Sequence, residues 1–174
     1  LLINTVSNTK NTLLDMSVGK GGDLWKWYEA KLGFVLGLDL SKMNIEDRKD
    51  GACARYLRYK SKHRKAPTCL FINGNSGLNL RNGSGIIDAK GKQLMTAVIG
   101  KGSKDKGVLG KVAYENYGIG SEGFDVVSNM FSTHYFFENV EMLNEYLKNV
   151  SEHCKINRYF IGTCYDGNRV FNML

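Results

Sequence analysis

The sequence has few of the residues that build metal sites and disulfide frameworks. Its four cysteines contain no CxxC pair, and none of its three histidines stands at ligand spacing from a cysteine. This pattern excludes a structural zinc site and predicts no bound metal. It is typical of reduced thiols in a cytoplasmic protein of the reducing intracellular environment. The cysteines are Cys53, Cys69, Cys154 and Cys164.

Long apolar segments are also missing. No apolar run approaches the roughly 20 residues that a membrane-spanning helix needs. No basic-then-apolar leader opens the chain, and no signal directs it to an organelle. We therefore expect no membrane partner.

Positive charge is in excess. Lys and Arg number 24 and Asp and Glu 17, which gives a formal net charge of +7. Such an excess favours polyanionic partners such as RNA, although it also serves solubility alone. Hydrophobic residues make up 43% of the 174 residues, which is enough for a core of one domain.

Apolar runs alternate with helical patterns along the chain. Strands are predicted over residues 12–16, 34–38, 68–73, 124–129 and 159–163. Helices are predicted over 23–32, 47–60 and 91–99, and along a stripe of Val140, Leu143, Leu147 and Val150. This alternation predicts an α/β, doubly wound, mostly parallel sheet with helices on both faces. Ligands of such folds bind beyond the carboxyl ends of the strands.

One segment departs from the alternation. Residues 74–123 hold 12 of the 20 glycines together with basic residues such as Lys101, Lys104 and Lys106. Loops of this length are usually functional or mobile. We predict a Gly/Lys-rich insertion at the ligand-binding edge, within a single domain over residues 1–174.

The first motif is a turn of small residues, DMSVGKGGD over residues 15–23, between the first strand and the first helix. Small residues let a backbone approach a ligand closely. The N-terminus of the following helix offers free N–H groups to an anion. The spacing fits neither a Walker A loop nor a strict GxGxxG. The alternative is a turn that serves packing alone.

The second motif is Asp39, about 20 residues beyond the turn and at the end of the second strand. A carboxylate there can accept both hydroxyls of an adenosine ribose, of S-adenosylmethionine or of NAD equally well. The alternative is a helix N-cap. Together, the turn and Asp39 favour an adenosine-type ligand.

The third motif is SNMFSTHYFF over residues 128–137, just after the fourth strand. His134 and Tyr135 could hydrogen-bond a base, and Phe131 or Tyr135 could stack on it. The alternative places at least two of Phe131, Phe136 and Phe137 in the core.

These motifs together resemble the mRNA cap guanine-N7 methyltransferases of eukaryotes and viruses. The family pattern reads LDLGCGKGGDL, then a strand ending in Asp, then QFxxHYxF and GGYFIGTxP. Its counterparts here are residues 14–24, 34–39, 130–137 and 158–163. The phrases GKGGDLWKW, STHYFFEN and YFIGTCYDGN are most similar to the capping enzymes of large (giant) DNA viruses.

The resemblance implies a Rossmann-like, class I S-adenosylmethionine-dependent methyltransferase fold, with its last strands missing from this chain. It implies methyl transfer from S-adenosylmethionine to N7 of the guanine cap of mRNA, in line and without metal. Capped mRNA is then the partner, and triphosphatase and guanylyltransferase domains are expected on the same longer chain. A viral protein of this kind would be located in the viral factory or the virion.

Carried over residue by residue, the resemblance implies positioning roles and no catalytic residue. Asp39 takes the ribose, Asn75 stands beside adenine, Tyr135 faces the cofactor and His134 faces the guanine. The implied cofactor-binding residues are Asp15, Ser17, Gly19, Gly21, Asp39, Leu40, Asn75, Met130 and Tyr135. The implied cap-binding or RNA-binding residues are Lys20, Lys26, Arg55, Phe131 and His134.

Several positions depart from the family pattern: Tyr165 replaces Pro and Asn157-Arg158 replaces Gly-Gly, and three further departures keep alternatives open. Ser17 replaces Gly, Asn75 replaces Asp and Met130 replaces Gln. One alternative is a methyltransferase that uses the same cofactor with another acceptor. A second is a catalytically inactive capping-enzyme subunit. A third is an NAD-dependent oxidoreductase, which a strict GxGxxG would have supported.

Overall fold

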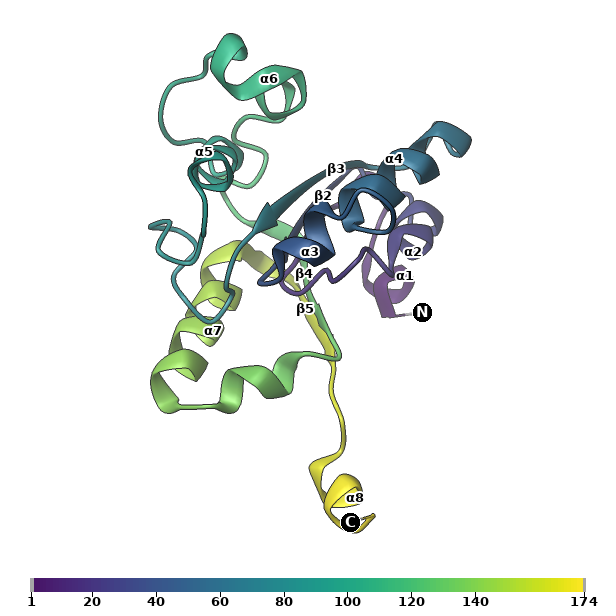
Figure 1. The fold of residues 1–174 in the computed structure, drawn as a ribbon, viewed down its shortest axis with the longest axis vertical. Coiled ribbons are helices and arrows are strands. Elements are labelled where there is room, and N and C mark those ends of the chain that lie inside the picture. Colours follow the sequence, from purple (N-terminus) through teal and green to yellow (C-terminus); the bar gives the residue numbers. More distant parts are fainter. Residues whose placement is uncertain (1, 174) are drawn as a thin grey trace.

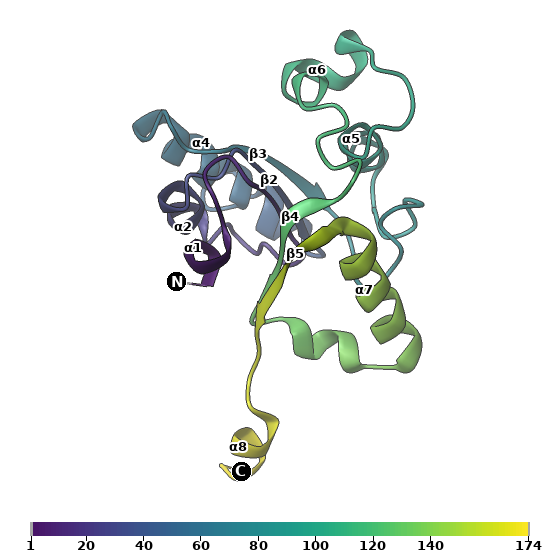
Figure 2. The ribbon, with the colours of Figure 1, turned by 180° about the vertical axis from the view of Figure 1, so that it is seen from behind.

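The computed structural model describes residues 2–173 and contains one five-stranded sheet (Figures 1 and 2). The strand order is β3-β2-β1-β4-β5, and all four neighbouring pairs are parallel. This arrangement confirms the predicted parallel α/β fold. The strands are β1 (Thr12–Asp15), β2 (Phe34–Asp39), β3 (Thr68–Asn73), β4 (Phe124–Met130) and β5 (Cys154–Thr163).

Helices cover both faces of the sheet, as the doubly wound prediction requires. One face packs against α1 (Leu2–Val6), α2 (Leu24–Glu29) and α4 (Ala52–Lys62). The other packs against α5 (Ala89–Val98) and α7 (Val140–His153). The remaining helical elements are α3 (Lys42–Glu46), α6 (Lys106–Glu115), η1 (Thr133–Phe137) and α8 (Gly167–Phe171).

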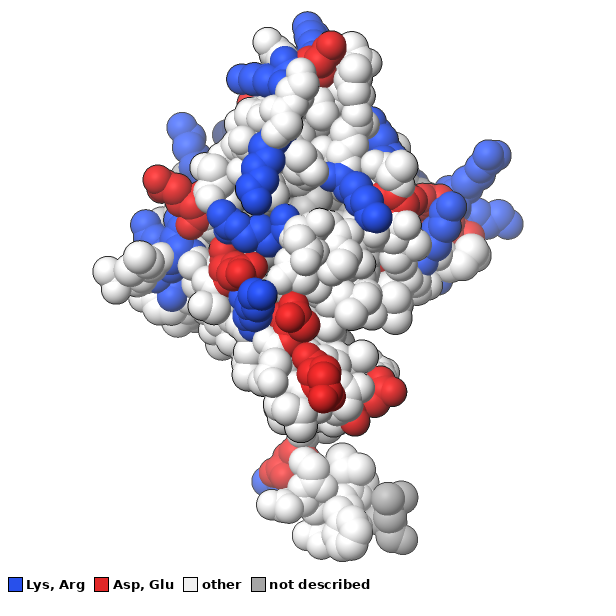
Figure 3. Space-filling model, turned by 90° about the vertical axis from the view of Figure 1, so that its left-hand side faces the viewer, with Lys and Arg blue, Asp and Glu red and all other residues white. Residues whose placement is uncertain are grey.

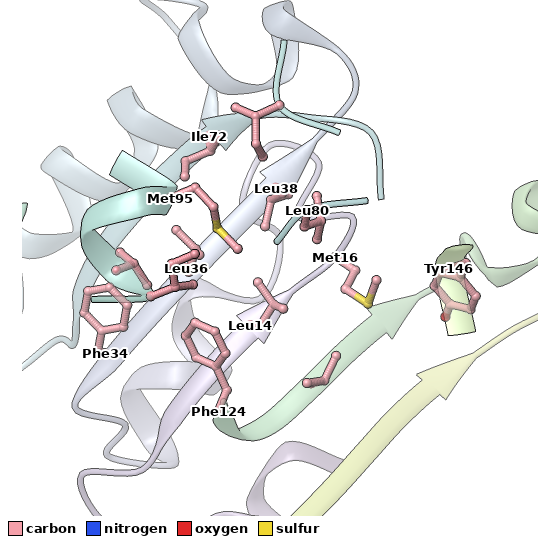
Figure 4. Close-up of a cluster of buried hydrophobic side chains, with 14 of the residues drawn as sticks. Leu14, Met16, Phe34, Leu36, Leu38, Ile72, Leu80, Met95, Phe124 and Tyr146 are labelled. Atoms are coloured by element: carbon pink, nitrogen blue, oxygen red, sulfur yellow. The ribbon is translucent and has the colours of Figure 1, made fainter. Parts of the chain in front are cut away.

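The core lies on both sides of the strands because successive side chains of a strand point to opposite faces. Leu14 and Leu36 pack with Met95 on the α5 and α7 side, where Phe34, Ile72 and Tyr146 also lie (Figure 4). Their neighbours Leu13 and Val35 pack with Trp27 on the other side. Burial on both faces explains why the strands read as continuous apolar runs.

The helix predicted over residues 47–60 is wrong in its first part. Helix α3 ends at Glu46 and α4 begins at Ala52, so the segment between them is a turn. The Asp47 carboxylate accepts the backbone N–H groups of Lys49 and Asp50, both at 2.9 Å. This side-chain bonding replaces helical hydrogen bonds and interrupts the helix.

The apolar stripe predicted for residues 140–150 is also wrong in part. Val140 and Leu147 are 68% and 52% exposed, whereas the helix buries Tyr146, Asn149 and His153 completely. Tyr146 stacks on Phe136 with ring centroids 4.1 Å apart. The buried face of α7 is therefore determined by a ring contact and by polar bonds to a loop. The spacing of apolar residues in the sequence does not reveal either of them.

The Gly/Lys-rich segment 74–123 contains two helices. The first, α5, was predicted, and the second, α6, was not. Helix α5 is the crossover between β3 and β4, and it buries Met95, Ala97 and Val98. Helix α6 packs on α5 through Leu109 and Ala113. The part of the segment that contains α5 thus covers a sheet face. Only its beginning, residues 74–76, lies at the edge where the strands end.

Within residues 2–173, no helix is both long and apolar enough to cross a membrane. The same residues contain no group of three or more His, Cys, Asp or Glu side chains that could hold a metal ion.

Candidate functional site

A cavity of about 490 Å³ opens at the carboxyl ends of β1, β2 and β3. Its size falls in the usual range for small-molecule sites. The position is the one predicted for ligands of a doubly wound sheet. Residues from five segments line it, among them Met16, Ser17, Asp39, Leu40, Asn44, Asn75, Ser76 and Tyr135.

Asp39 stands at the end of β2 and is the only acidic residue besides Glu138 that lines this cavity. Its Oδ2 accepts the backbone N–H of Gly19 at 2.8 Å. Its Oδ1 accepts the Ser41 N–H at 2.9 Å and the Asn44 side-chain amide at 3.0 Å. A carboxylate has about four lone-pair positions, so one remains for a ligand hydroxyl in this arrangement.

The turn after β1 lies between two strands and keeps an open surface. Val18 donates its N–H to Leu38 O at 2.7 Å, and Met16 donates to Ser128 O at 2.9 Å. Gly19 has a φ of +55°, and a Cβ built there or at Gly22 would meet no atom within 4 Å. These glycines leave space in which a ligand can approach the backbone.

Asp15, the last residue of β1, is buried beside this turn and lines a second cavity. The pKa of its carboxyl is raised from 3.8 to about 7, chiefly by burial and also by the nearby Asp23 and Asp39 charges. The Ser17 N–H, 3.2 Å from Oδ1, and the Lys26 charge pull the pKa down. Asp15 therefore titrates near neutral pH, and a positive group nearby would favour its charged form.

The loop after β3 forms the third wall. The Ser76 hydroxyl donates to Met16 O at 2.7 Å, which fixes the loop against the end of β1. The Asn75 Oδ1 accepts the Gly77 N–H at 2.8 Å, so its amide nitrogen is the group left to face a ligand. The loop is held from behind by Asn149, whose Nδ2 donates to Ser76 O and Leu78 O.

An aromatic group follows β4. His134 and Tyr135 have ring centroids 4.2 Å apart, and Tyr165 lies 5.6 Å from His134 and 6.3 Å from Phe131. Tyr135 is 67% exposed and lines the cavity. The alternative that placed two of the three phenylalanines of this segment in the core is wrong, because only Phe136 is buried.

The second cavity, of about 310 Å³, adjoins the first at Ser17. Met130 and Phe131 line it together with Lys20 and Arg55. Lys20 forms an ion pair of 2.7 Å with Asp50, an exposed carboxylate. Arg55 forms no ion pair with any residue between 2 and 173.

The structure brings most of the predicted residues to these two cavities. The larger one contains Ser17, Asp39, Leu40, Asn75 and Tyr135. The smaller one contains Asp15, Ser17, Gly19, Lys20, Arg55, Met130 and Phe131.

Three predicted residues line neither cavity. Gly21 has a φ of +72° and faces a separate groove toward α4. Lys26 is paired with Asp23 at 2.6 Å. His134 is exposed at the rim, in contact with Tyr135 and Tyr165.

Several residues that shape the site were not predicted. Asn73 donates its side-chain amide to Asp39 O and Leu40 O, and so fixes the loop that follows β2. Asn44 donates its side-chain amide to the Asp39 carboxylate. Ser76 donates its hydroxyl to Met16 O. The run Asn73-Gly74-Asn75-Ser76 at a strand end was a usable signal, since polar residues there face the ligand edge. No comparable sequence signal placed Tyr165 at the site.

Solved structures with this fold include methyltransferases. An rRNA methylase from Streptococcus thermophilus superposes with a TM-score of 0.51 at 10% identity, covering 98% of this chain and 71% of that one. At this identity the likeness concerns the fold alone. It confirms a Rossmann-like, class I methyltransferase fold.

Sequence comparison identifies the family within that class. The family model described as "mRNA (guanine-N(7))-methyltransferase domain" matches residues 2–83 and 101–174. The chain belongs to this family, and the predicted resemblance is confirmed.

Two curated relatives have capping names. The "Probable mRNA-capping enzyme" of Acanthamoeba polyphaga mimivirus is 28% identical over 173 residues, which is 99% of this chain and 14% of the relative. The "mRNA cap guanine-N(7) methyltransferase" of Pyricularia oryzae is 31% identical over 143 residues, 80% of this chain and 27% of the relative. The chain thus spans less than a third of either protein.

Proposed function

We propose that this chain binds S-adenosylmethionine and transfers its methyl group to N7 of the guanine cap of mRNA. The observation that carries the proposal is the meeting, in one cavity, of the Asp39 carboxylate, Ser17 at the small-residue turn, and Tyr135. Membership of the guanine-N7 methyltransferase domain family supports the acceptor.

The residues present suit this cofactor. Asp39 is positioned by three donors and retains capacity for a ribose hydroxyl. Gly19 and Gly22 leave an open space beside the turn. The buried Asp15 carboxyl, with a pKa of about 7, is placed to favour a positively charged group. S-adenosylmethionine supplies an already activated methyl group, so the protein needs no nucleophilic side chain.

The chain's residues act by holding and orienting the acceptor. Guanine N7 has an available lone pair and requires no general base. Tyr135 and the exposed His134 offer a ring face and a ring N–H at the cavity rim. Alignment of reacting atoms can contribute roughly 7–11 kcal/mol in favourable cases. Lys20 and Arg55, the two cations that line the adjoining cavity, are assigned to the cap phosphates.

The test is a methyl-transfer assay on the full-length protein with GpppRNA and an uncapped RNA of the same sequence. We expect labelled methyl groups only in the capped RNA, released as 7-methylguanine on digestion. Equal labelling of both RNAs would contradict the N7 assignment. Cofactor binding without any transfer would instead identify a catalytically inactive subunit.

We also propose that the chain is one part of a longer capping polypeptide that carries triphosphatase and guanylyltransferase domains. The match to the mimivirus relative supports this proposal, because 99% of this chain aligns with only 14% of that protein. The four free cysteines support a reducing, cytoplasmic location, such as a viral factory or virion. Fractionation of expressing cells, with thiol labelling of the protein, tests the location.

A further inference from the structure

A groove of about 280 Å³ lies between α2 and α4, on the side of the sheet away from α5 and α7. We call it the α2–α4 groove and define it by Gly22, Trp25, Arg55, Arg58, Tyr59 and Lys62. None of the residues that line it is acidic.

The cations of the groove stand on one face of one helix. Arg55, Arg58 and Lys62 follow at positions i, i+3 and i+7 of α4, which places them along a single stripe. Between Arg55 and Lys62 the helix rises about 10 Å. None of the three forms an ion pair with another residue of the described chain, 2–173. The stripe is therefore a line of unneutralised positive charge.

An exposed aromatic ring faces these cations across the groove. Trp25 is 43% exposed, whereas Trp27, two residues further along α2, is fully buried. The Lys26 ammonium lies 5.9 Å from the centroid of the Trp25 ring. An indole left open beside a basic stripe combines the two features with which proteins bind single-stranded nucleic acid.

The groove is continuous with the candidate site. Gly22 and Arg55 line both the groove and the 310 Å³ cavity, and Ser17 joins that cavity to the larger one. By contrast, the face that bears α5, α6 and α7 carries Lys and Arg interspersed with Asp and Glu (Figure 3). A polyanion that enters the 310 Å³ cavity can therefore continue into a groove whose lining contains cations and no acidic side chain.

We propose that the α2–α4 groove binds the RNA chain beyond the cap, with phosphates on Arg58 and Lys62 and one base on the Trp25 ring. The inference rests on the proposed function and names the path of its substrate. An acidic protein segment would satisfy the cations, but it would offer no planar base to the indole. RNA satisfies both.

The experiment compares a capped single-stranded RNA of about 16 nucleotides with a cap dinucleotide as substrates of the full-length protein. The test variant is Arg58→Gln with Lys62→Gln, both on exposed side chains. The matched control is Lys111→Gln with Lys148→Gln, which removes the same charge from α6 and α7 and breaks no ion pair.

For the test variant we expect KM for the capped RNA to rise roughly fivefold, with kcat and KM for the dinucleotide within about twofold of wild type. The slope of log affinity against log salt should become shallower by about 1.4, since each phosphate contact on a single strand contributes about 0.7. Trp25→Ala should raise KM for the RNA roughly tenfold, and Trp25→Phe should restore most of the loss.

A test variant that behaves like the control would overturn the proposal and leave an acidic protein segment as the occupant. Equal losses on RNA and dinucleotide would also overturn it, because the two cations would then serve the cap or the fold. The same variants are titrated with uncapped RNA by fluorescence anisotropy, which requires no methyl transfer. If RNA binding depends on the groove but the protein does not methylate caps, the proposed function is wrong and the assignment of the groove to RNA stands.

Discussion

The Asp39 carboxylate accepts the backbone N–H of Gly19 at 2.8 Å, which joins the end of β2 to the turn that follows β1. The other carboxylate oxygen accepts the Ser41 N–H and the Asn44 amide. One half-buried charge therefore organises two loops and also lines the cavity between them.

We expect Asp39→Ala to weaken binding of S-adenosylmethionine by about 1.5–3 kcal/mol, because hydrogen bonds to a charged acceptor are lost. The melting temperature should fall as well, since three donors lose their shared acceptor. Titration calorimetry measures the affinity. Asp50→Ala is the control, because it removes an exposed carboxylate that is paired with Lys20 and lines neither cavity. Equal affinities of wild type and Asp39→Ala would remove Asp39 from the cofactor site.

We expect His134→Ala to lower methyl transfer to GpppRNA at least about tenfold through misalignment of the guanine, since a shift of about 1 Å can cost a hundredfold. Cofactor affinity should remain near wild type, because His134 does not line the larger cavity. The control is Phe137→Ala, another exposed ring in the same short helix. Normal transfer by His134→Ala would make it a surface residue without a role in the reaction.

Asp15 should make stability depend on pH. Its folded-state pKa is about 7 against an ordinary 3.8, so the folded protein holds this proton more tightly than the unfolded chain. The contribution of Asp15 to the free energy of unfolding therefore falls as pH rises from about 4 to about 7, by an amount on the order of 4 kcal/mol, and is constant beyond either limit.

Asp15→Asn cannot ionise, and its amide oxygen can still accept the Ser17 N–H. We expect the variant to exceed wild type in stability near pH 8 and to lose this advantage near pH 4. Urea denaturation at the two pH values measures the difference. Parallel stability curves for the two proteins would show that Asp15 does not titrate in this range.

Asn149 provides a prediction for a residue remote from the ligand. Its side chain accepts the Leu80 N–H and donates to Ser76 O and Leu78 O while fully buried. Asn149→Ala should lower the free energy of unfolding by about 3 kcal/mol, because buried backbone groups lose their partners. Asn144→Ala, on an exposed position of α7, should change it by less than about 0.5 kcal/mol.

Asn149→Ala should also weaken cofactor binding, since Ser76 and Asn75 line the larger cavity. Affinity and stability are measured side by side. An Asn149→Ala protein that is unstable but binds the cofactor normally would show that the loop after β3 needs no support from α7.

The fold was predictable because its strands are apolar on both faces and end in recognisable turns. Residues 68–73 form a strand at the predicted bounds, and the site residues at the ends of β1 and β2 lie where expected. Family resemblance, rather than spacing, selected Asn75 and assigned Tyr135 to the cofactor, and both residues line the cavity.

What could not be predicted depends on contacts between distant segments. Asn149 and His153 are buried in α7 because Asn149 bonds the 76–80 loop, which no local pattern reveals. The break between α3 and α4 depends on the Asp47 carboxylate, which accepts backbone N–H groups and forms a turn. Helical propensity alone would predict that the helix continues through this segment. Tyr165 approaches His134 across a gap of 31 positions.

The strand order has a consequence for synthesis on the ribosome. β1 is the central strand, and its second neighbour, β4, lies far along the chain, since Thr12 donates to Asp125 across 113 positions. At about 5–20 residues per second, roughly 6 to 23 seconds separate the emergence of the two. During that interval β1, β2 and β3 can pair, while the far edge of β1 remains an open template for other chains. A chaperone that covers this edge would act before the cavity exists.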